Sequence, residues 1–174
     1  MRNDSLANIY AVDFKESFSF DRQGELEKGT KWADYLVGVV DQFMKKGHLL
    51  HGFDCAFAGD MPIGAGMSSS AALEAGLAFA LSEMNDIDIS RTELARIAQR
   101  AENEFVGVRC GIMDQFANLL GKKGSALHLD CRSPDFDYIP FDGEGLKVVL
   151  CDTGLKSAAM SWTFSSVRHR ALTG

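Results

Sequence analysis

The sequence predicts an α+β domain, in which strands and helices are mixed without strict alternation. A helical repeat of apolar residues begins at Lys31, and strand-like segments at 8–14 and 53–58 lie on either side of it. A second helical stretch follows a loop rich in glycine and serine at 64–70. With 174 residues, 46% of them hydrophobic, the chain can bury one core but is too short for two full domains.

The elements of the first half follow from residue spacing. Residues 8–14 combine aromatic and β-branched side chains with polar ones, which predicts a strand, and the polar segment 21–30 predicts a loop. From Lys31 onward, apolar residues recur at steps of three and four, so we expect a helix that ends at Gly47. Alternation over 53–58 predicts a second strand.

The second half is predicted in the same way. An Ala- and Leu-rich helix should follow the loop and end near Asn85. The next helix should begin at Ser90, with Glu93 completing a capping box. Its apolar face comprises Leu94, Ile97, Ala98, Ala101 and Phe105. A short helix over 114–120, closed by Gly121, and strands at 126–131 and 146–151 complete the set.

Charge and hydropathy exclude several classes of partner. With 18 basic and 24 acidic residues, the net charge is −6 and provides no broad positive field for nucleic acid or anionic lipid. The longest apolar stretch, 71–81, contains a glutamate and is far shorter than the roughly 20 residues of a membrane span. The first residues contain no apolar signal segment, so we expect a cytoplasmic location.

The cysteines and histidines do not form a catalytic or metal-binding pattern. Four cysteines are far apart, with no C-x-x-C and no histidine at zinc spacing, which favours reduced thiols buried in or beside strands. They are Cys55, Cys110, Cys131 and Cys151. None of the four histidines has the neighbours of a hydrolase triad.

The strongest local signal is the loop from Gly64 to Ser70, which leads directly into a helix. Gly64 and Gly66 permit positive φ and close backbone approach, and a helix start offers unpaired N–H groups. The serines add hydroxyl donors and a magnesium ligand. These features predict a phosphate cradle, although neither G-K-[ST] nor G-x-G-x-x-G is present. A serine-rich helix cap with a tight turn is the alternative.

Three acidic residues each allow two interpretations. Glu74, on the Ala-rich helix, faces solvent or caps a neighbour. Glu102 lies near the apolar face of its helix, where a carboxylate is costly unless it is paired or binds a cation; an exposed edge is the alternative. Asp114 is either the N-cap of a short helix or a carboxylate aimed into a cleft to orient or deprotonate a hydroxyl nucleophile.

Two longer motifs resemble the galactokinases of the GHMP small-molecule kinase superfamily. Residues 62–74, P-I-G-A-G-M-S-S-S-A-A-L-E, are similar to the superfamily's P-x-G-x-G-L-S-S-S-A nucleotide motif. Residues 107–116, G-V-R-C-G-I-M-D-Q-F, are similar to the galactokinase segment G-V-x-C-G-I-M-D-Q-F. Segments 121–124, 129–132 and 151–154 support the resemblance, which covers about residues 5–156.

The resemblance implies a site and a reaction. ATP phosphates would be wrapped by Gly64, Ala65, Gly66, Met67, Ser68, Ser69 and Ser70. Magnesium would be held by Ser70 and Glu102, the sugar would lie against Gly111, and Asp114 would be the catalytic base for the anomeric hydroxyl. The implied reaction converts ATP and α-D-galactose into ADP and galactose 1-phosphate, so MgATP and galactose are the expected small-molecule partners.

The resemblance also implies a fold and a domain plan. Residues 1–156 would form a GHMP-kinase N-terminal domain, incomplete at its N-terminus, with the architecture of the second domain of ribosomal protein S5. That architecture is a mixed sheet with helices on one face. Residues 157–174 would be a divergent tail, and the family's C-terminal domain would be absent.

The chain also departs from the family pattern. It begins after the segment G-R-x-x-x-x-G-E-H-x-D-Y, which supplies a catalytic arginine, and the family's sugar-contacting tyrosine is replaced by Thr163 or Phe164. Because such cations contribute about 10³–10⁵ in rate, we expect little or no activity from this chain alone. We also expect self-association through surfaces left exposed by truncation.

Three alternatives to a galactokinase stay open. The first is another GHMP kinase, acting on N-acetylgalactosamine, arabinose or a non-sugar alcohol. The second is a non-catalytic relative that binds nucleotide or sugar, or a remnant with no ligand. The third is a purely structural α+β domain, which requires both long motif matches to be accidental.

Overall fold

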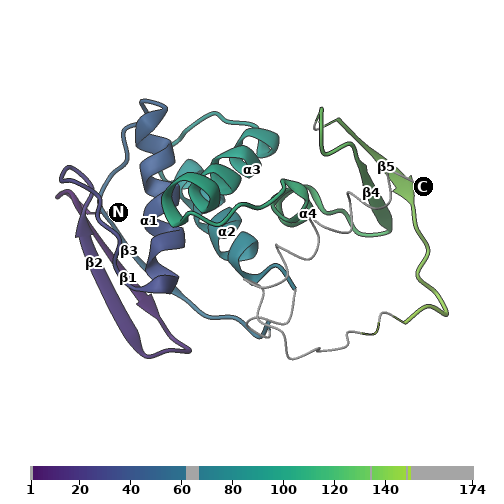
Figure 1. Ribbon diagram of the computed structural model, residues 1–174, viewed down its shortest axis with the longest axis horizontal. Coiled ribbons are helices and arrows are strands. Elements are labelled where there is room, and N and C mark those ends of the chain that lie inside the picture. Colours follow the sequence, from purple (N-terminus) through teal and green to yellow (C-terminus); the bar gives the residue numbers. More distant parts are fainter. Residues whose placement is uncertain (1, 62–66, 134, 148, 150–174) are drawn as a thin grey trace, which may run out of the picture.

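The chain folds as a three-stranded sheet with helices packed on one face, and a separate two-stranded hairpin beyond those helices (Figure 1). A computed structural model describes residues 2–61, 67–133, 135–147 and 149. The order of elements confirms the predicted α+β class and the mixed sheet with helices on one face. Neither the expected tail 157–174 nor Thr163 and Phe164 lie within the described residues.

The sheet has the strand order β2-β1-β3. The central strand β1 (Leu6–Ala11) is antiparallel to β2 (Glu16–Asp21) and parallel to β3 (Phe53–Phe57). Strand β1 buries alternate residues, which places one sheet face against the helices. The predicted strand 8–14 was too long at its end, because the chain turns after Ala11, and β2 was not predicted.

The helices agree closely with the residue spacing. Helix α1 (Lys31–Lys45) is followed by Gly47 at φ +82°, and α2 (Ser69–Met84) ends at Asn85 as expected. Helix α3 (Arg91–Arg100) continues into a π-helical segment, η1 (Ala101–Val106). Helix α4 (Met113–Leu120) ends at Gly121.

Only half of the predicted capping box forms at α3. The Ser90 side chain accepts a hydrogen bond from the Glu93 backbone N–H at 3.2 Å. The Glu93 carboxylate does not reach back to Ser90 but pairs with Lys46, after the end of α1, and with Arg96. The acid therefore contributes to the packing of α3 against α1. Burial acts to raise the pKa of Glu93, but the contacts with Lys46 and Arg96 together outweigh burial and lower that pKa.

The core lies between the sheet and the helices. Its largest fully buried apolar side chains come from α1, β3, α4, β1, α2 and α3, and include Phe43, Phe53, Phe116, Ile9, Leu36, Leu81, Leu94 and Ile97. The predicted apolar face of α3 and its continuation is buried except for the half-buried Phe105. Because these helices and strands all contribute side chains to one core, the packing of that core fixes their positions relative to one another.

The hairpin comprises β4 (Ser125–Leu129) and β5 (Phe136–Pro140). An edge contact between Phe116 and Phe136, with ring centroids 6.1 Å apart, and a 2.7 Å hydrogen bond from the Tyr138 hydroxyl to the Leu120 carbonyl attach it to α4. Strand β5 was not predicted. The strand predicted at 146–151 is wrong for Leu146, Lys147 and Val149, which lie outside any strand; its other positions are not described.

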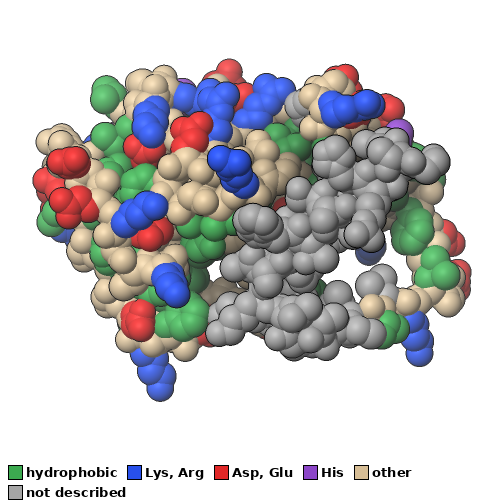
Figure 2. Space-filling view, in the orientation of Figure 1, with side chains coloured by type: hydrophobic (Ala, Val, Ile, Leu, Met, Phe, Trp, Pro, Cys, Tyr) green, Lys and Arg blue, Asp and Glu red, His purple; other side chains and the backbone are tan. Residues whose placement is uncertain are grey.

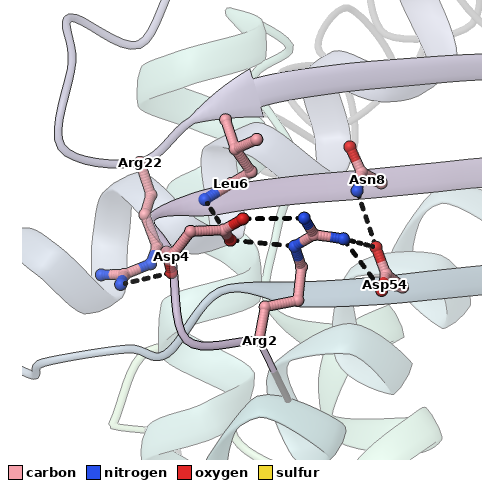
Figure 3. Close-up of polar contacts among 6 residues, drawn as sticks. All are labelled: Arg2, Asp4, Leu6, Asn8, Arg22 and Asp54. Atoms are coloured by element: carbon pink, nitrogen blue, oxygen red, sulfur yellow. Dashed lines mark hydrogen bonds and ion pairs between the residues drawn. The ribbon is translucent and has the colours of Figure 1, made fainter.

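A network of charges fastens the N-terminal residues to the sheet (Figure 3). The Arg2 guanidinium donates to Asp4 at 2.7 Å and to Asp54 of β3 at 3.0 Å, while Asn8 donates to Asp54 at 2.7 Å. The Arg2 hydrogen bonds lower the pKa of Asp4 to about 2. Because these hydrogen bonds are exposed to solvent, they contribute little to the free energy of unfolding. Their effect is to hold the residues before β1 next to β3.

The surface carries charges of both signs. On the face shown in Figure 2, Lys and Arg side chains are interspersed with Asp and Glu. This mixture agrees with the predicted lack of a broad positive field. Among the described helices, none has the length and apolar content required to cross a bilayer.

Helix α1 packs closely on the π-helical segment through a glycine. A Cβ at Gly38 would lie 3.0 Å from the Phe105 Cβ and 3.1 Å from the Ala101 carbonyl oxygen. Gly76, in the middle of α2, faces open space among the described atoms. The two positions therefore provide a crowded and an open helical glycine for comparison.

We predict that Gly38→Val lowers the free energy of unfolding by about 1–3 kcal/mol, because the added methyl groups overpack the contact between α1 and η1. Gly76→Val is the matched control and should be neutral or slightly stabilising, since valine has the better helix propensity. Urea unfolding of both variants measures the difference. Equal stabilities would show that the close contact does not constrain the fold.

Candidate active site

The described part of the predicted phosphate cradle is the start of α2. Ser68 adopts a left-handed conformation with φ 59°, and its side chain makes no capping hydrogen bond. Ser68 therefore occupies the N-cap position of α2, as the alternative of a serine cap expects, but it does not cap the helix through its side chain. First-turn N–H groups are suited to an anionic ligand. Gly64, Ala65 and Gly66 lie outside the described residues.

The structure brings together Ser70 and Glu102, the two predicted magnesium ligands. The Ser70 hydroxyl donates a hydrogen bond to Glu102 Oε1 at 3.1 Å. Glu102 is only 6% exposed, so the exposed-edge alternative is wrong. It lies in η1, and π-helical turns occur frequently at functional sites.

Two further donors approach the second oxygen of Glu102. Gln115 Nε2 donates to Oε2 at 3.0 Å, and the Cys110 thiol donates to the same oxygen at 3.3 Å. Burial, followed by the Glu102 charge, raises the pKa of Cys110 to about 12, so its thiol keeps the proton that it donates. Asn103 binds the backbone N–H of Cys110 at 2.8 Å and fixes the loop beside the carboxylate.

Glu74 is fully buried, so the prediction that it faces solvent is wrong. Neither carboxyl oxygen has a hydrogen-bond partner among the described residues, and buried Gln115 Oε1 also lacks one. Burial, followed by repulsion from Glu102, raises the pKa of Glu74 to about 10, although the Gln115 amide acts in the opposite direction. A proton on Glu74 would turn one of its two carboxyl oxygens from an acceptor without a partner into a hydrogen-bond donor.

Asp114 lies in the first turn of α4 and is half-buried. The N-cap of this helix is Ile112, so the interpretation of Asp114 as an N-cap is wrong. Within the described part of the chain, its carboxylate forms no hydrogen bond or ion pair. Gly111 is exposed, and a Cβ added there would meet no described atom within 4 Å.

A cavity of about 520 Å³ adjoins the start of α2. Its lining includes Met61, which directly precedes the undescribed residues 62–66, and Ser69 and Ser70 at the start of α2. Its aromatic walls are Phe14, Trp32, Tyr35 and Phe57. Burial raises the pKa of Tyr35, and the charges of Glu102 and Glu74 raise it further. Tyr35 lines the cavity and is therefore close enough to the two buried acids for their charges to act on it. The cavity suits a flat apolar group attached to an anion held near the serines.

Glu16 orients one wall of this cavity. Its carboxylate accepts a 2.6 Å hydrogen bond from the Trp32 indole N–H, and the Trp32 ring lies 5.6 Å from Phe57 between centroids. From the sequence, Trp32 and Tyr35 served only as part of the helical repeat that begins at Lys31. The cavity was therefore not predicted from the sequence. The feature that could have indicated it is the pair of large aromatic residues at the start of α1.

The predicted pair fits magnesium. A hydroxyl and a carboxylate oxygen are hard ligands of the kind that magnesium prefers, and this ion commonly combines one or two carboxylates with waters and substrate phosphates. The described residues contain no group of three or more His, Cys, Asp or Glu side chains able to hold a metal. Ser70 and Glu102 thus suit an ion that arrives with a nucleotide.

The cysteines agree only partly with their prediction. Cys55, Cys110 and Cys131 are free thiols, and Cys151 lies outside the described residues. Cys55 is half-buried in β3, but Cys110 lies in a loop at the candidate site and Cys131 is exposed. Sequence analysis missed the contacts of Cys110 and Gln115 with Glu102, although both residues belong to the 107–116 motif.

The family of the chain follows from its sequence as well as its site. Residues 34–122, just over half of the chain, match the family model of the GHMP kinases N-terminal domain. The chain belongs to the GHMP kinase family. The matched range includes the Ser70–Glu102 pair and Asp114.

Within this family, similar curated proteins are galactokinases. That of Thermococcus kodakarensis is 41% identical over 164 residues, which are 94% of this chain and 46% of that protein. Those of Thermotoga maritima and Bacillus subtilis are 42% and 37% identical, and the matches cover 83% and 97% of this chain. The chain spans 41–46% of the length of these three relatives.

Solved structures agree with this similarity. The Lactococcus lactis galactokinase, determined in complex with galactose, has a TM-score of 0.78 and 29% identity, covering 82% of this chain and 38% of that one. Methanococcus jannaschii mevalonate kinase has a TM-score of 0.64 at 19% identity, covering 82% of this chain and 45% of that one, which shows a shared fold.

We predict that Glu74 makes the stability of the chain depend on pH. Its pKa is about 10 in the folded chain and near the ordinary 4.5 when unfolded, so folding takes up a proton between these values. The free energy of unfolding should therefore fall as pH rises from 5 to 9. Glu74→Gln should remove much of this slope and be more stable by about 1–3 kcal/mol at pH 8.

Urea unfolding at several pH values, without magnesium or nucleotide, measures this effect. Glu104→Gln is the control, because Glu104 is an exposed glutamate on the same π-helical segment. An unchanged slope in Glu74→Gln would mean that Glu74 is ionised in the folded chain.

Proposed function

We propose that this chain carries the phosphate- and sugar-facing machinery of a galactokinase, which converts ATP and α-D-galactose into ADP and α-D-galactose 1-phosphate in galactose metabolism. The observation that carries the proposal is the meeting of Ser70 with buried Glu102, on a helix start beside the cavity. The galactokinase relatives and the motif at 107–116 favour galactose over the other sugars and alcohols that GHMP kinases use.

The nucleotide is placed by the start of α2 and the cavity. The cavity accepts the base between its aromatic walls, and the loop 64–70 with the first N–H groups of α2 receives the phosphates. Ser70 and Glu102 hold the magnesium of MgATP. When bound, the ion neutralises phosphate charge and orients the γ-phosphate.

The sugar is placed at Gly111 and Asp114. The open space beside Gly111 allows a sugar ring to approach the backbone, and the free carboxylate of Asp114 accepts a hydrogen bond from the anomeric hydroxyl. Asp114 orients this hydroxyl and takes its proton as the bond to phosphorus forms.

The transfer is an in-line displacement. The C1 oxygen of galactose bonds to the γ-phosphorus while the bond from that phosphorus to the β–γ bridging oxygen breaks. The bridging oxygen leaves on ADP with its electron pair. The proton of the hydroxyl moves to Asp114, which later releases it to water.

We expect the chain alone to form galactose 1-phosphate slowly, and we predict that Asp114→Asn lowers this residual rate by about 10²–10⁴-fold, because the amide cannot accept the proton. Product formation from galactose and MgATP is measured with the purified 174-residue chain, together with MgATP binding by calorimetry. MgATP affinity should be unchanged, since Asp114 contacts the sugar and not the nucleotide.

The result distinguishes the alternatives. MgATP or galactose binding without turnover would exclude a remnant with no ligand. Product from N-acetylgalactosamine or arabinose in preference to galactose would favour another sugar-specific GHMP kinase. A folded chain that binds neither ligand would contradict the proposal.

We predict that Gly111→Ala weakens galactose binding by about 10–100-fold while the free energy of unfolding changes by less than about 0.5 kcal/mol. The added methyl group meets no described protein atom, so its effect should fall on the ligand. Calorimetric titration with galactose and urea unfolding measure the two quantities. Unchanged galactose affinity would place the sugar elsewhere.

A further inference from the structure

Gln115 is a fully buried amide that reaches from α4 to η1. We propose that Gln115 is a positioning residue, which fixes the Glu102 carboxylate for magnesium and ties it to the helix that carries Asp114. This inference rests on the proposed function but concerns a residue that the proposed chemistry does not use.

The first support is the direction of the Gln115 side chain. It occupies the third position of α4, where a glutamine commonly folds back to the N-cap backbone N–H. Here the N-cap Ile112 provides no side-chain hydrogen bond, and the Gln115 amide donates to Glu102 across the core instead. The glutamine therefore provides a tertiary contact in place of local helix capping.

The second support is the division of donors between the two carboxylate oxygens. Oε1 accepts a hydrogen bond from Ser70, a residue that lines the cavity, whereas Gln115 and Cys110 both donate to Oε2. A thiol is a weak donor, so the amide is the stronger restraint on Oε2. Because these two donors restrain Oε2, the carboxylate cannot rotate freely, and Oε1 stays beside Ser70 in a fixed orientation.

The third support is the place of Gln115 next to Asp114. Neighbouring positions on a helix point about 100° apart. Gln115 is directed into the core while Asp114 is half-buried at the open side. One turn thus carries both the anchor for the magnesium carboxylate and the base, and a shift of the anchor would displace both groups.

The test compares affinities for MgATP and for ATP in EDTA, measured by calorimetry on the full chain. Gln115→Met keeps the side-chain volume and removes the hydrogen bond. We expect it to reduce the ratio of MgATP to metal-free ATP affinity by about 10–100-fold, with metal-free affinity nearly unchanged. A merely structural role would weaken both affinities together and leave the ratio intact.

Gln42→Met is the matched control. Gln42 is also buried, and its amide donates at 2.9 Å to Glu104 on the same π-helical segment, but it does not touch Glu102. This variant should keep the wild-type ratio. If Gln115→Met fails to fold, Gln115→Asn provides the same measurement, since its amide is one methylene too short to reach Glu102.

The outcomes separate this inference from the proposed function. A metal preference that is present in the wild type and kept in the Gln115 variants overturns the positioning role and leaves the function standing. A loss in Gln42→Met equal to that in Gln115→Met also overturns it, because the effect would not be specific to Glu102. A wild-type chain with no metal preference overturns both.

Discussion

A buried carboxylate constrains this molecule more than any other single group described. Glu102 is almost inaccessible to water, and its charge is tolerable only because donors reach it from α2, from the loop before α4 and from α4 itself. Each donor belongs to a different segment, so all three must be packed before the carboxylate is satisfied. The elements that complete the core therefore also assemble the candidate metal ligand.

Glu74, the second buried acid in the described part of the chain, shows what happens when a carboxyl group is buried without such donors. Glu74 is as deeply buried, but its carboxyl oxygens have no hydrogen-bond partner among the described residues, and burial and the Glu102 charge favour its protonated form. Two carboxyl groups close together thus receive different surroundings, one supplied with donors for a charge and one deprived of them. Such separation is typical of sites where acids of one residue type have different tasks.

Local signals predicted the elements whose ends depend on single residues. Gly47, Ser90 and Gly121 marked helix boundaries because left-handed backbone, capping and helix termination are properties of a few adjacent residues. The contacts of Gln115 were missed because spacing along the sequence does not reveal which side chain meets Glu102 in the core, and strand β5 was missed because its five residues are mostly exposed and end in proline. Ser70 and Glu102 were predicted as partners through the family resemblance, since their separation of 32 positions reveals nothing about contact.

Helix α1 shows why a correct period can still give an incomplete answer. Its C-terminal half buries Phe43 in the core, whereas Trp32 and Tyr35 in its first turns line the cavity. The same apolar face continues past the region where other elements cover it, and there it lines the cavity. Because Gly38 lies between these halves against η1, one helix connects the cavity with the segment that holds Glu102. A shift of α1 would therefore alter the cavity wall and the surroundings of Glu102 together.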